Sequence, residues 1–155
     1  DYYINRSGIK IKIGVDTNPP TGFSTEHKLL LLPFSFMTRC YVQPDLYAGK
    51  MHALLFRNWK TRVKGRDWYD FEWYVRNNVS VNFNHFCERA HQFDPYKTEA
   101  DKEDFKQFLK EKILKISMDL LKNDVRPFVK DPAEMDIWST EYFLQLVDLI
   151  KFENQ

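Results

Sequence analysis

A run of positive charge followed by two carboxylates is the feature of this sequence best suited to chemistry. Asp67 and Asp70 are three positions apart, a spacing that places both on one face of a helix. The whole chain carries a net charge of only +1, so the excess of positive charge just before these acids predicts an anionic partner. Five cations make up this excess, with no acid between them: Arg57, Lys60, Arg62, Lys64 and Arg66.

Lys50 is a second candidate, because it stands in an otherwise apolar stretch between Gly49 and Met51. It could bind a phosphate as a point charge held on a rigid helix. The competing interpretation is a lysine whose methylene stem runs along the helix to solvent. Gly49 costs a helix about 1 kcal/mol relative to alanine, so it predicts a close approach by another backbone or a ligand.

The two carboxylates and the basic run each allow two interpretations. Asp67 suits a helix N-cap and Asp70 the positive end of the helix dipole, yet either could accept a proton from a hydroxyl or help to hold a divalent metal. Residues 57–66 could be a solvated loop. Their interleaving with Trp59 and Trp68 favours contact with a phosphate backbone combined with ring stacking on bases.

Composition bounds the class of protein. The 155 residues have the size of one domain, and the aromatic content of 16% predicts a core of rings or an apolar surface for a partner. Cys40 and Cys87 lack paired spacing and the four histidines are scattered, so no metal site or disulfide is predicted and a cytoplasmic location is favoured. The longest apolar run, residues 29–34, is too short to span a membrane.

Alternation of apolar residues over 9–15 predicts a half-buried strand. Residues 29–32 and 33–42 are apolar and predict either one strand broken at Pro33 or two. These segments form the first predicted region, residues 1–43, with a small antiparallel sheet of two or three strands.

Residues 44–155 form the second predicted region, a bundle of about five helices, so the fold class is α+β. The predicted helices cover residues 44–58, 67–77, 84–92, 102–123 and 140–152. The first begins at Pro44, and its residues Leu46, Lys50, Ala53 and Arg57 share one face. The fourth carries a continuous apolar stripe from Phe105 to Leu120. Ser139 caps the last, with Trp138 and Phe143 as a hydrophobic staple.

Four stretches of this sequence resemble the C-terminal half of the AbiEii/AbiGii toxin family. They are L-Y-A-G-K-M-H-A-L-L-F-R from residue 46, K-G-R-D-W-Y-D-F from residue 64, D-T-N-P-P-T-G-F from residue 16 and D-I-W-S-T-E-Y-F from residue 136. The matches are spread over most of the chain, which makes the resemblance specific to the family.

The resemblance implies a role in bacterial toxin–antitoxin or abortive-infection systems. The family is similar to the DNA polymerase β-like nucleotidyltransferases. The resemblance implies that the toxins of the family transfer a nucleotide from an NTP, with tRNA as the acceptor for several of them. The family's lysine motif falls on Lys50, and its R-D-x-x-D motif falls on Arg66, Asp67 and Asp70. The implied partners are an NTP, Mg²⁺, a nucleic acid and a cognate antitoxin, with no membrane.

The sequence departs from the family pattern at the metal site. The family's signature is a Gly-Ser turn followed by a D-x-D pair on a strand, and this chain has no D-x-D. Asp16 is not assigned in its place. The chain begins at Asp1, so we expect a C-terminal portion that does not transfer nucleotides or bind Mg²⁺ and NTP by itself. The alternative is a non-catalytic remnant that binds RNA or the antitoxin.

Overall fold

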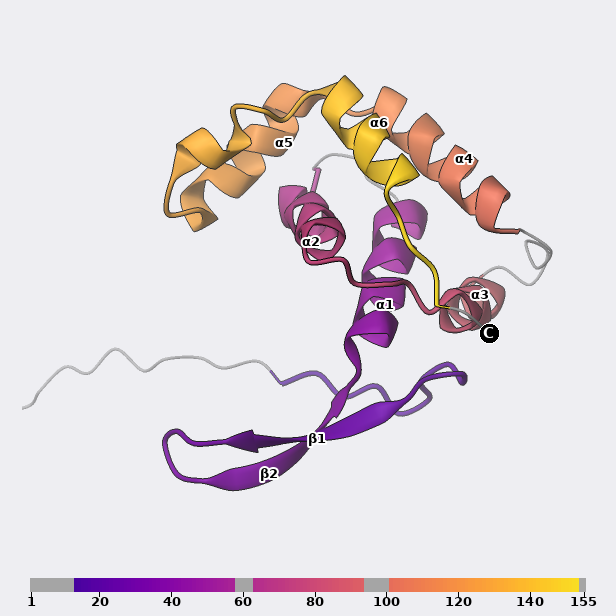
Figure 1. The fold of residues 1–155 in the computed structure, drawn as a ribbon, viewed down its shortest axis with the longest axis vertical. Helices are drawn as coiled ribbons and strands as arrows, with labels where there is room; N and C mark the ends of the chain where they lie inside the picture. The colour runs from indigo at the N-terminus through magenta and orange to yellow at the C-terminus, as the bar shows by residue number, and fades with distance from the viewer. Residues whose placement is uncertain (1–12, 58–62, 94–100, 154–155) are drawn as a thin grey trace, which may run out of the picture.

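The computed structural model describes residues 13–57, 63–93 and 101–153 of the chain. A two-stranded antiparallel hairpin precedes six α-helices in these residues (Figure 1). The predicted fold class, α+β with a small sheet followed by helices, is therefore confirmed.

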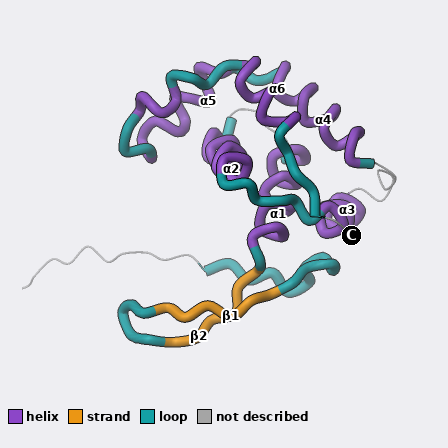
Figure 2. The backbone as a smooth tube through the Cα atoms, in the orientation of Figure 1, coloured by secondary structure: helices purple, strands orange, loops and turns teal. Residues whose placement is uncertain are grey.

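The hairpin pairs β1 (Thr25–Leu30) with β2 (Phe36–Tyr41), in a register that runs from Thr25 opposite Tyr41 to Leu30 opposite Phe36. The apolar segment is thus two strands that turn around Pro33, as one of the two predictions had it. The strand predicted over 9–15 is wrong at residues 13–15, which are irregular, while residues 9–12 lie outside the described chain. The hairpin extends away from the helices (Figure 2) and exposes several large apolar side chains, Leu29, Leu31, Leu32, Phe34 and Met37 among them.

Helix α1 (Gln43–Phe56) follows the hairpin directly and lies at the centre of the helical part (Figure 1). Pro44 occupies its first turn, as predicted, and the helix ends two residues before the predicted boundary. Tyr47, Met51 and Leu54 are fully buried on its inner side, where α2 and α3 pack. This burial holds α1 in place with its opposite face free to line a site.

Helix α2 (Gly65–Arg76) begins at Gly65, so the prediction that Asp67 is its N-cap is wrong. Lys64 holds the N-cap position without a side-chain bond, and the Gly65 N–H donates instead to the Asp124 carboxylate at 2.9 Å. Asp70 is the sixth residue of α2 and lies beyond its first turn. Both carboxylates are therefore available for other contacts.

The predicted helix over 102–123 is two helices, α4 (Lys102–Leu114) and α5 (Met118–Val125). Ser117 ends the continuity, because its hydroxyl caps α5 by accepting from the Leu120 N–H at 3.4 Å. The predicted apolar stripe stops with it: Ile113 is fully buried, whereas Leu120 is 60% exposed. The remaining elements are α3 (Phe83–Phe93), the short 3₁₀ turns Arg126–Phe128 and Pro132–Met135, and α6 (Thr140–Asp148).

Two predictions for the last helix are confirmed. Ser139 caps α6 by accepting from the Tyr142 N–H at 3.1 Å, and the rings of Trp138 and Phe143 meet across that cap at 5.2 Å. The helix is shorter than predicted, because the chain after Asp148 extends to form a parallel bridge between Val81 and Phe152.

Aromatic rings fill much of the core between the helices. Trp68 is fully buried and meets Phe143 edge-on at 5.4 Å, and Tyr47 stacks on Tyr74 at 4.5 Å. The burial of Trp68 contradicts its predicted stacking on nucleic-acid bases, because no face of its ring reaches solvent. Trp59, the other ring of that prediction, lies outside the described residues.

Two helical glycines should respond oppositely to alanine. A Cβ at Gly65 would overlap Val125 Cγ2 and lie 2.6 Å from the Leu121 carbonyl oxygen, whereas a Cβ at Gly49 would meet Arg89 Cζ at an ordinary 3.8 Å. Gly65→Ala should therefore lower the free energy of unfolding by about 1–3 kcal/mol. Gly49→Ala should raise it by about 1 kcal/mol. Urea denaturation of both variants measures the two values, and a stable Gly65→Ala protein would contradict the packing of α2 on α5.

Candidate functional site

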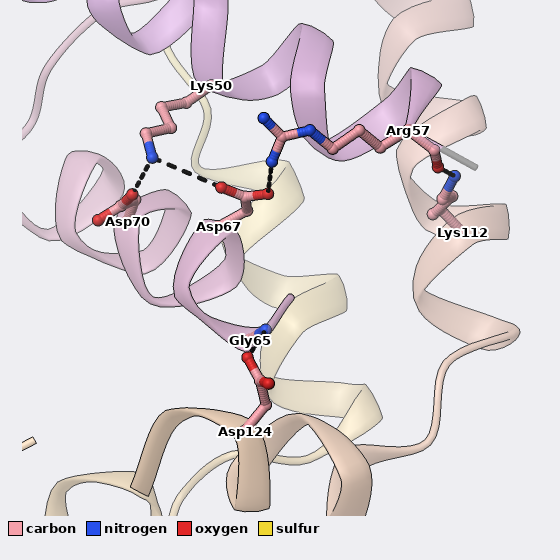
Figure 3. Close-up of polar contacts among 7 residues, drawn as sticks. All are labelled: Lys50, Arg57, Gly65, Asp67, Asp70, Lys112 and Asp124. Carbon is pink, nitrogen blue, oxygen red and sulfur yellow. Dashed lines mark hydrogen bonds and ion pairs between the residues drawn. The ribbon is translucent and has the colours of Figure 1, made fainter. Parts of the chain in front are cut away.

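The buried carboxylate of Asp67 joins α1 to α2 at the centre of the candidate site (Figure 3). Only 5% of Asp67 is exposed. Arg57 Nη1 donates to its Oδ2 at 3.0 Å and Lys50 Nζ lies 3.5 Å from its Oδ1, so each oxygen has a cationic partner. A buried carboxylate needs such partners because its desolvation is otherwise uncompensated.

Lys50 also reaches the second carboxylate of α2. Its Nζ lies 2.5 Å from Asp70 Oδ2, and its side chain stays 39% exposed. Lys50 therefore stands between two carboxylates, with part of its side chain exposed to solvent. The prediction that Lys50 and Arg57 share a face is confirmed, since Leu46, Lys50, Ala53 and Arg57 line one cavity.

Two cavities flank the Lys50–Asp67–Arg57 bridge, and all three of these residues line both. The cavity beside α2 and α5, of about 460 Å³, is lined by four cations and two carboxylates, Lys50, Arg57, Lys64, Arg66, Asp67 and Asp70, with Phe128 among its other residues. The cavity between α1 and α3, of about 300 Å³, adds His85 and Arg89. Both volumes are of the order that small ligands occupy.

The structure describes three of the five cations in the predicted basic run, Arg57, Lys64 and Arg66. Lys64 and Arg66 are exposed at the start of α2 and line the larger cavity, where the Arg66 guanidinium lies 4.9 Å from the Phe128 ring centroid. Lys60 and Arg62 lie outside the described residues. The structure therefore brings Arg57, Lys64 and Arg66 together with the carboxylates.

Both ends of this basic segment are held by charged side chains from the C-terminal helices (Figure 3). Lys112 Nζ of α4 donates to the carbonyl oxygens of Leu55 at 2.8 Å and Arg57 at 3.5 Å. Asp124 of α5 accepts from Gly65, as described above. A cation at a helix C-terminus and an anion at a helix N-terminus both oppose the charge of the helix dipole, so these contacts stabilise the positions where α1 ends and α2 begins.

Several residues of the site had no signal in the sequence. Arg89 and His85 lie on α3, and the neighbour of Gly49 is the Arg89 guanidinium at an ordinary contact distance rather than another backbone. Asp45 is buried, with its two oxygens 2.6 Å from the Ser24 N–H and the Asn82 amide. Asp45 is therefore occupied in holding the chain before β1 against α1 and α3.

His52 is a neutral packed residue, as its scattered position suggested. Burial, together with electrostatic interactions with the nearby Arg89 and His85 side chains, lowers the pKa of His52 to about 4. Its ring stacks on Phe56 at 4.8 Å. At neutral pH it therefore carries no charge and does not add to the positive charge around the site.

The described residues do not by themselves form a Mg²⁺ site. No three of their His, Cys, Asp or Glu side chains come close enough to hold a metal, and Asp67 and Asp70 are both bonded to Lys50. Asp16 accepts from the Asn18 N–H at 3.1 Å within its own turn. We therefore assign no chemical step to a metal on these residues. Of the helices described, none is long and apolar enough to cross a membrane.

Comparison with known families shows which family the chain belongs to. The model of the family described as "Nucleotidyl transferase AbiEii toxin, Type IV TA system" matches residues 3–146. The chain belongs to this family. Comparisons with curated proteins and with solved structures give no match. Membership supports a role as a nucleotidyl transferase-like toxin and implies a cognate antitoxin.

The charged residues of the stretches that carry the resemblance to the family come together in space. The lysine-containing stretch forms α1 and the R-D-x-x-D stretch opens α2, so their charged residues meet in the Lys50–Asp67–Asp70 contacts. The stretch from Asp16 to Phe23 lies against α3, where the Gln92 amide donates to the Asn18 carbonyl at 3.2 Å and His85 Nδ1 lies 2.8 Å from the Thr21 carbonyl oxygen. Since a carbonyl only accepts, Nδ1 of His85 carries a proton.

The lowered pKa of His52 predicts a pH dependence of stability. In the unfolded chain a histidine titrates near pH 6.5, so the unfolded state binds a proton as the pH falls below that value while folded His52 stays neutral until about pH 4. Stability contributed by His52 is therefore present above pH 6.5 and lost between pH 6.5 and 4, by on the order of 2 kcal/mol after allowance for a partly exposed ring.

Chemical denaturation at pH 7 and pH 4 measures this loss. The His52→Gln variant should lose less stability than the wild type over that interval, because the variant lacks the titrating ring. His27→Gln, on the exposed face of β1, is the matched control and should behave as the wild type. An equal loss in all three proteins would contradict the assignment to His52.

Proposed function

We propose that the Lys50–Asp67–Asp70 cluster handles the nucleotide in a nucleotidyl transfer reaction, as part of a toxin that modifies a nucleic-acid acceptor. The observation that carries this proposal is the position of Lys50 Nζ between two carboxylates at a wall shared by two cavities. A lysine there can bind the triphosphate of an NTP as a point charge without leaving its carboxylate partners.

The reaction balances as a substitution at phosphorus. A hydroxyl oxygen of the acceptor forms a bond to the α-phosphorus of the NTP, and the bond from that phosphorus to the bridging oxygen of the β-phosphate breaks. The electron pair stays on that oxygen, pyrophosphate leaves, and the hydroxyl proton passes to a carboxylate. The contribution of this cluster is positioning and charge, which dominate catalysis of phosphoryl transfer.

The two carboxylates suit different roles. Asp67 is buried with a cation on each oxygen, so it fixes Lys50 and Arg57. Asp70 is 38% exposed, and among the described residues its ion pair is to Lys50 alone. Asp70 is therefore the better placed of the two to take the proton from an acceptor that enters the larger cavity.

The acceptor in this proposal is a nucleic acid, with tRNA as the first one to test. Lys64 and Arg66 carry exposed positive charge on the rim of the larger cavity, next to Asp70. Arg57, Lys60 and Arg62 extend the same basic segment in the sequence. Such side chains bind a phosphate backbone without selecting a sequence.

Nucleotide binding tests the role of Lys50. The sequence alone predicts no NTP binding by this chain, but the two cavities beside Lys50 lead us to expect binding without turnover. In calorimetric titrations of the 155-residue chain with each of the four NTPs, Lys50→Met should weaken binding by at least about tenfold, because it removes a charged hydrogen-bond donor. Lys50→Arg should keep part of the affinity. Arg39→Met, an exposed cation on β2 that lines neither cavity, is the matched control. Wild-type binding that Lys50→Met leaves unchanged, or a wild type that binds no NTP, contradicts the proposal.

The acceptor role predicts a measurable salt dependence. Replacing Lys64 and Arg66 with alanine should weaken tRNA binding and flatten the slope of log affinity against log salt by about 0.7 per contact, hence about 1.4 for the pair. The control pair Lys115→Ala and Arg39→Ala removes the same charge from exposed positions outside both cavities. Equal slopes in the two double variants, each with a native melting curve, would show that the segment is only solvated charge.

A further inference from the structure

Arg89 lines the smaller cavity and is not part of the Lys50–Asp67–Arg57 bridge. This cavity of about 300 Å³ lies between α1 and α3, with Gly49 and Lys50 on one side and His85 and Arg89 on the other. Arg89 is partly buried, and its guanidinium lies across Gly49, where a Cβ would be 3.8 Å from both Cζ and Nε.

The Nε of Arg89 is buried and makes no hydrogen bond. Buried donors are almost always bonded, so this side chain is held in an unusual position. Arg89 also lines the cavity, where its guanidinium can meet a ligand that supplies acceptors. The planar fork of donors on a guanidinium matches the oxygens of a phosphate.

The carboxylate oxygens of the cavity already have hydrogen-bond or ion-pair partners other than Arg89. Both oxygens of Asp45 are taken by Ser24 and Asn82, and both oxygens of Asp67 by Lys50 and Arg57. Neither carboxylate is then free to pair with Arg89. The lining carries three cationic side chains against these two carboxylates, so an anion entering the cavity meets net positive charge.

The position of the cavity relative to the larger cavity indicates which anion it could bind. The Lys50–Asp67–Arg57 bridge separates it from the larger cavity, where Lys64, Arg66 and Asp70 lie. In phosphoryl transfer the attacking and leaving oxygens are roughly in line on opposite sides of the phosphorus. An acceptor in the larger cavity therefore directs the leaving group across the bridge towards Arg89.

We propose that the cavity between α1 and α3 is the subsite for the diphosphate group of the nucleotide, the β- and γ-phosphates that leave as pyrophosphate, and that Arg89 binds them directly. This inference rests on the proposed function for its reaction, but the subsite is a property of the cavity and can be tested without turnover. Gly49 is part of it, because it lines the cavity next to the Arg89 guanidinium.

Inorganic pyrophosphate is the probe. In calorimetric titrations, Arg89→Gln should weaken pyrophosphate binding by about tenfold or more, since a charge-assisted fork of hydrogen bonds is lost. Arg39→Gln on β2 is the matched control and should bind as the wild type. A nucleoside monophosphate, which lacks the diphosphate group, should bind both variants equally. Pyrophosphate affinity that is the same in Arg89→Gln and the wild type overturns the proposal.

A measurement on the wild type covers the case in which Arg89→Gln does not fold. In NMR spectra the Gly49 amide and the Arg89 Nε–H resonances should shift on addition of pyrophosphate. Shifts confined to residues outside this cavity overturn the proposal. The two hypotheses can be distinguished. If pyrophosphate binding depends on Arg89 but Lys50→Met does not affect NTP binding, the subsite is supported and the proposed nucleotide function is contradicted. If NTP binding depends on Lys50 but Arg89→Gln has no effect on pyrophosphate binding, the proposed function is supported and the subsite is contradicted.

Discussion

The pairing of one buried carboxylate with two cations sets the arrangement of everything around the site. Asp67 is the fixed point, because a carboxylate that is 95% removed from solvent must keep its partners, and both come from α1. Losing a partner from a fully buried pair costs about 3–5 kcal/mol. The cost is smaller here, since Lys50 and Arg57 are themselves 39% and 48% exposed. The bridge therefore fixes α1 against α2 while leaving both cations able to contact a ligand.

The C-terminal helices support that bridge from outside. Glu72 lies two positions beyond Asp70, on the buried side of α2, where Trp138 Nε1 donates to it at 2.8 Å and the Tyr142 hydroxyl at 2.6 Å. These bonds attach α2 to α6 and the residues before it, and the rings of Trp68 and Phe143 pack beside them. The charged residues of α2 thus face the cavities, because its opposite face is held by aromatic packing and a satisfied carboxylate.

Local patterns predicted the parts of this fold that depend on neighbouring residues. Proline near the start of α1, the Ser139 cap and the Trp138–Phe143 staple are each decided within a few positions, and all three are confirmed. The continuous apolar stripe over 102–123 led to the wrong prediction of one helix. The helical spacing of apolar residues continues across Ser117, although the hydroxyl of Ser117 starts a new helix there. Asp67 misled for the opposite reason: its sequence context fits a cap, and the cap comes from Asp124, 57 positions away.

In the candidate site too, residues close in sequence were predicted and contacts between distant residues were not. Lys50, Arg57, Asp67 and Asp70 stood out because unusual charges recur at helical spacing, and the structure brings them together. Arg89 could not be identified, since its relation to Gly49 exists only once α3 lies across α1. The sequence pattern alone does not show that α3 places Arg89 beside Gly49.

Lys112 and Asp124 fix the two helix ends between which the chain passes from α1 to α2. Lys112 donates to the carbonyl oxygens of Leu55 and Arg57, and Asp124 accepts from the Gly65 N–H, so these contacts lie on either side of the connection. The entropy of closing a loop changes only slowly with its length, by about 0.6 kcal/mol for each doubling. A longer connection between α1 and α2 should therefore leave the Lys50–Asp67 contact in register.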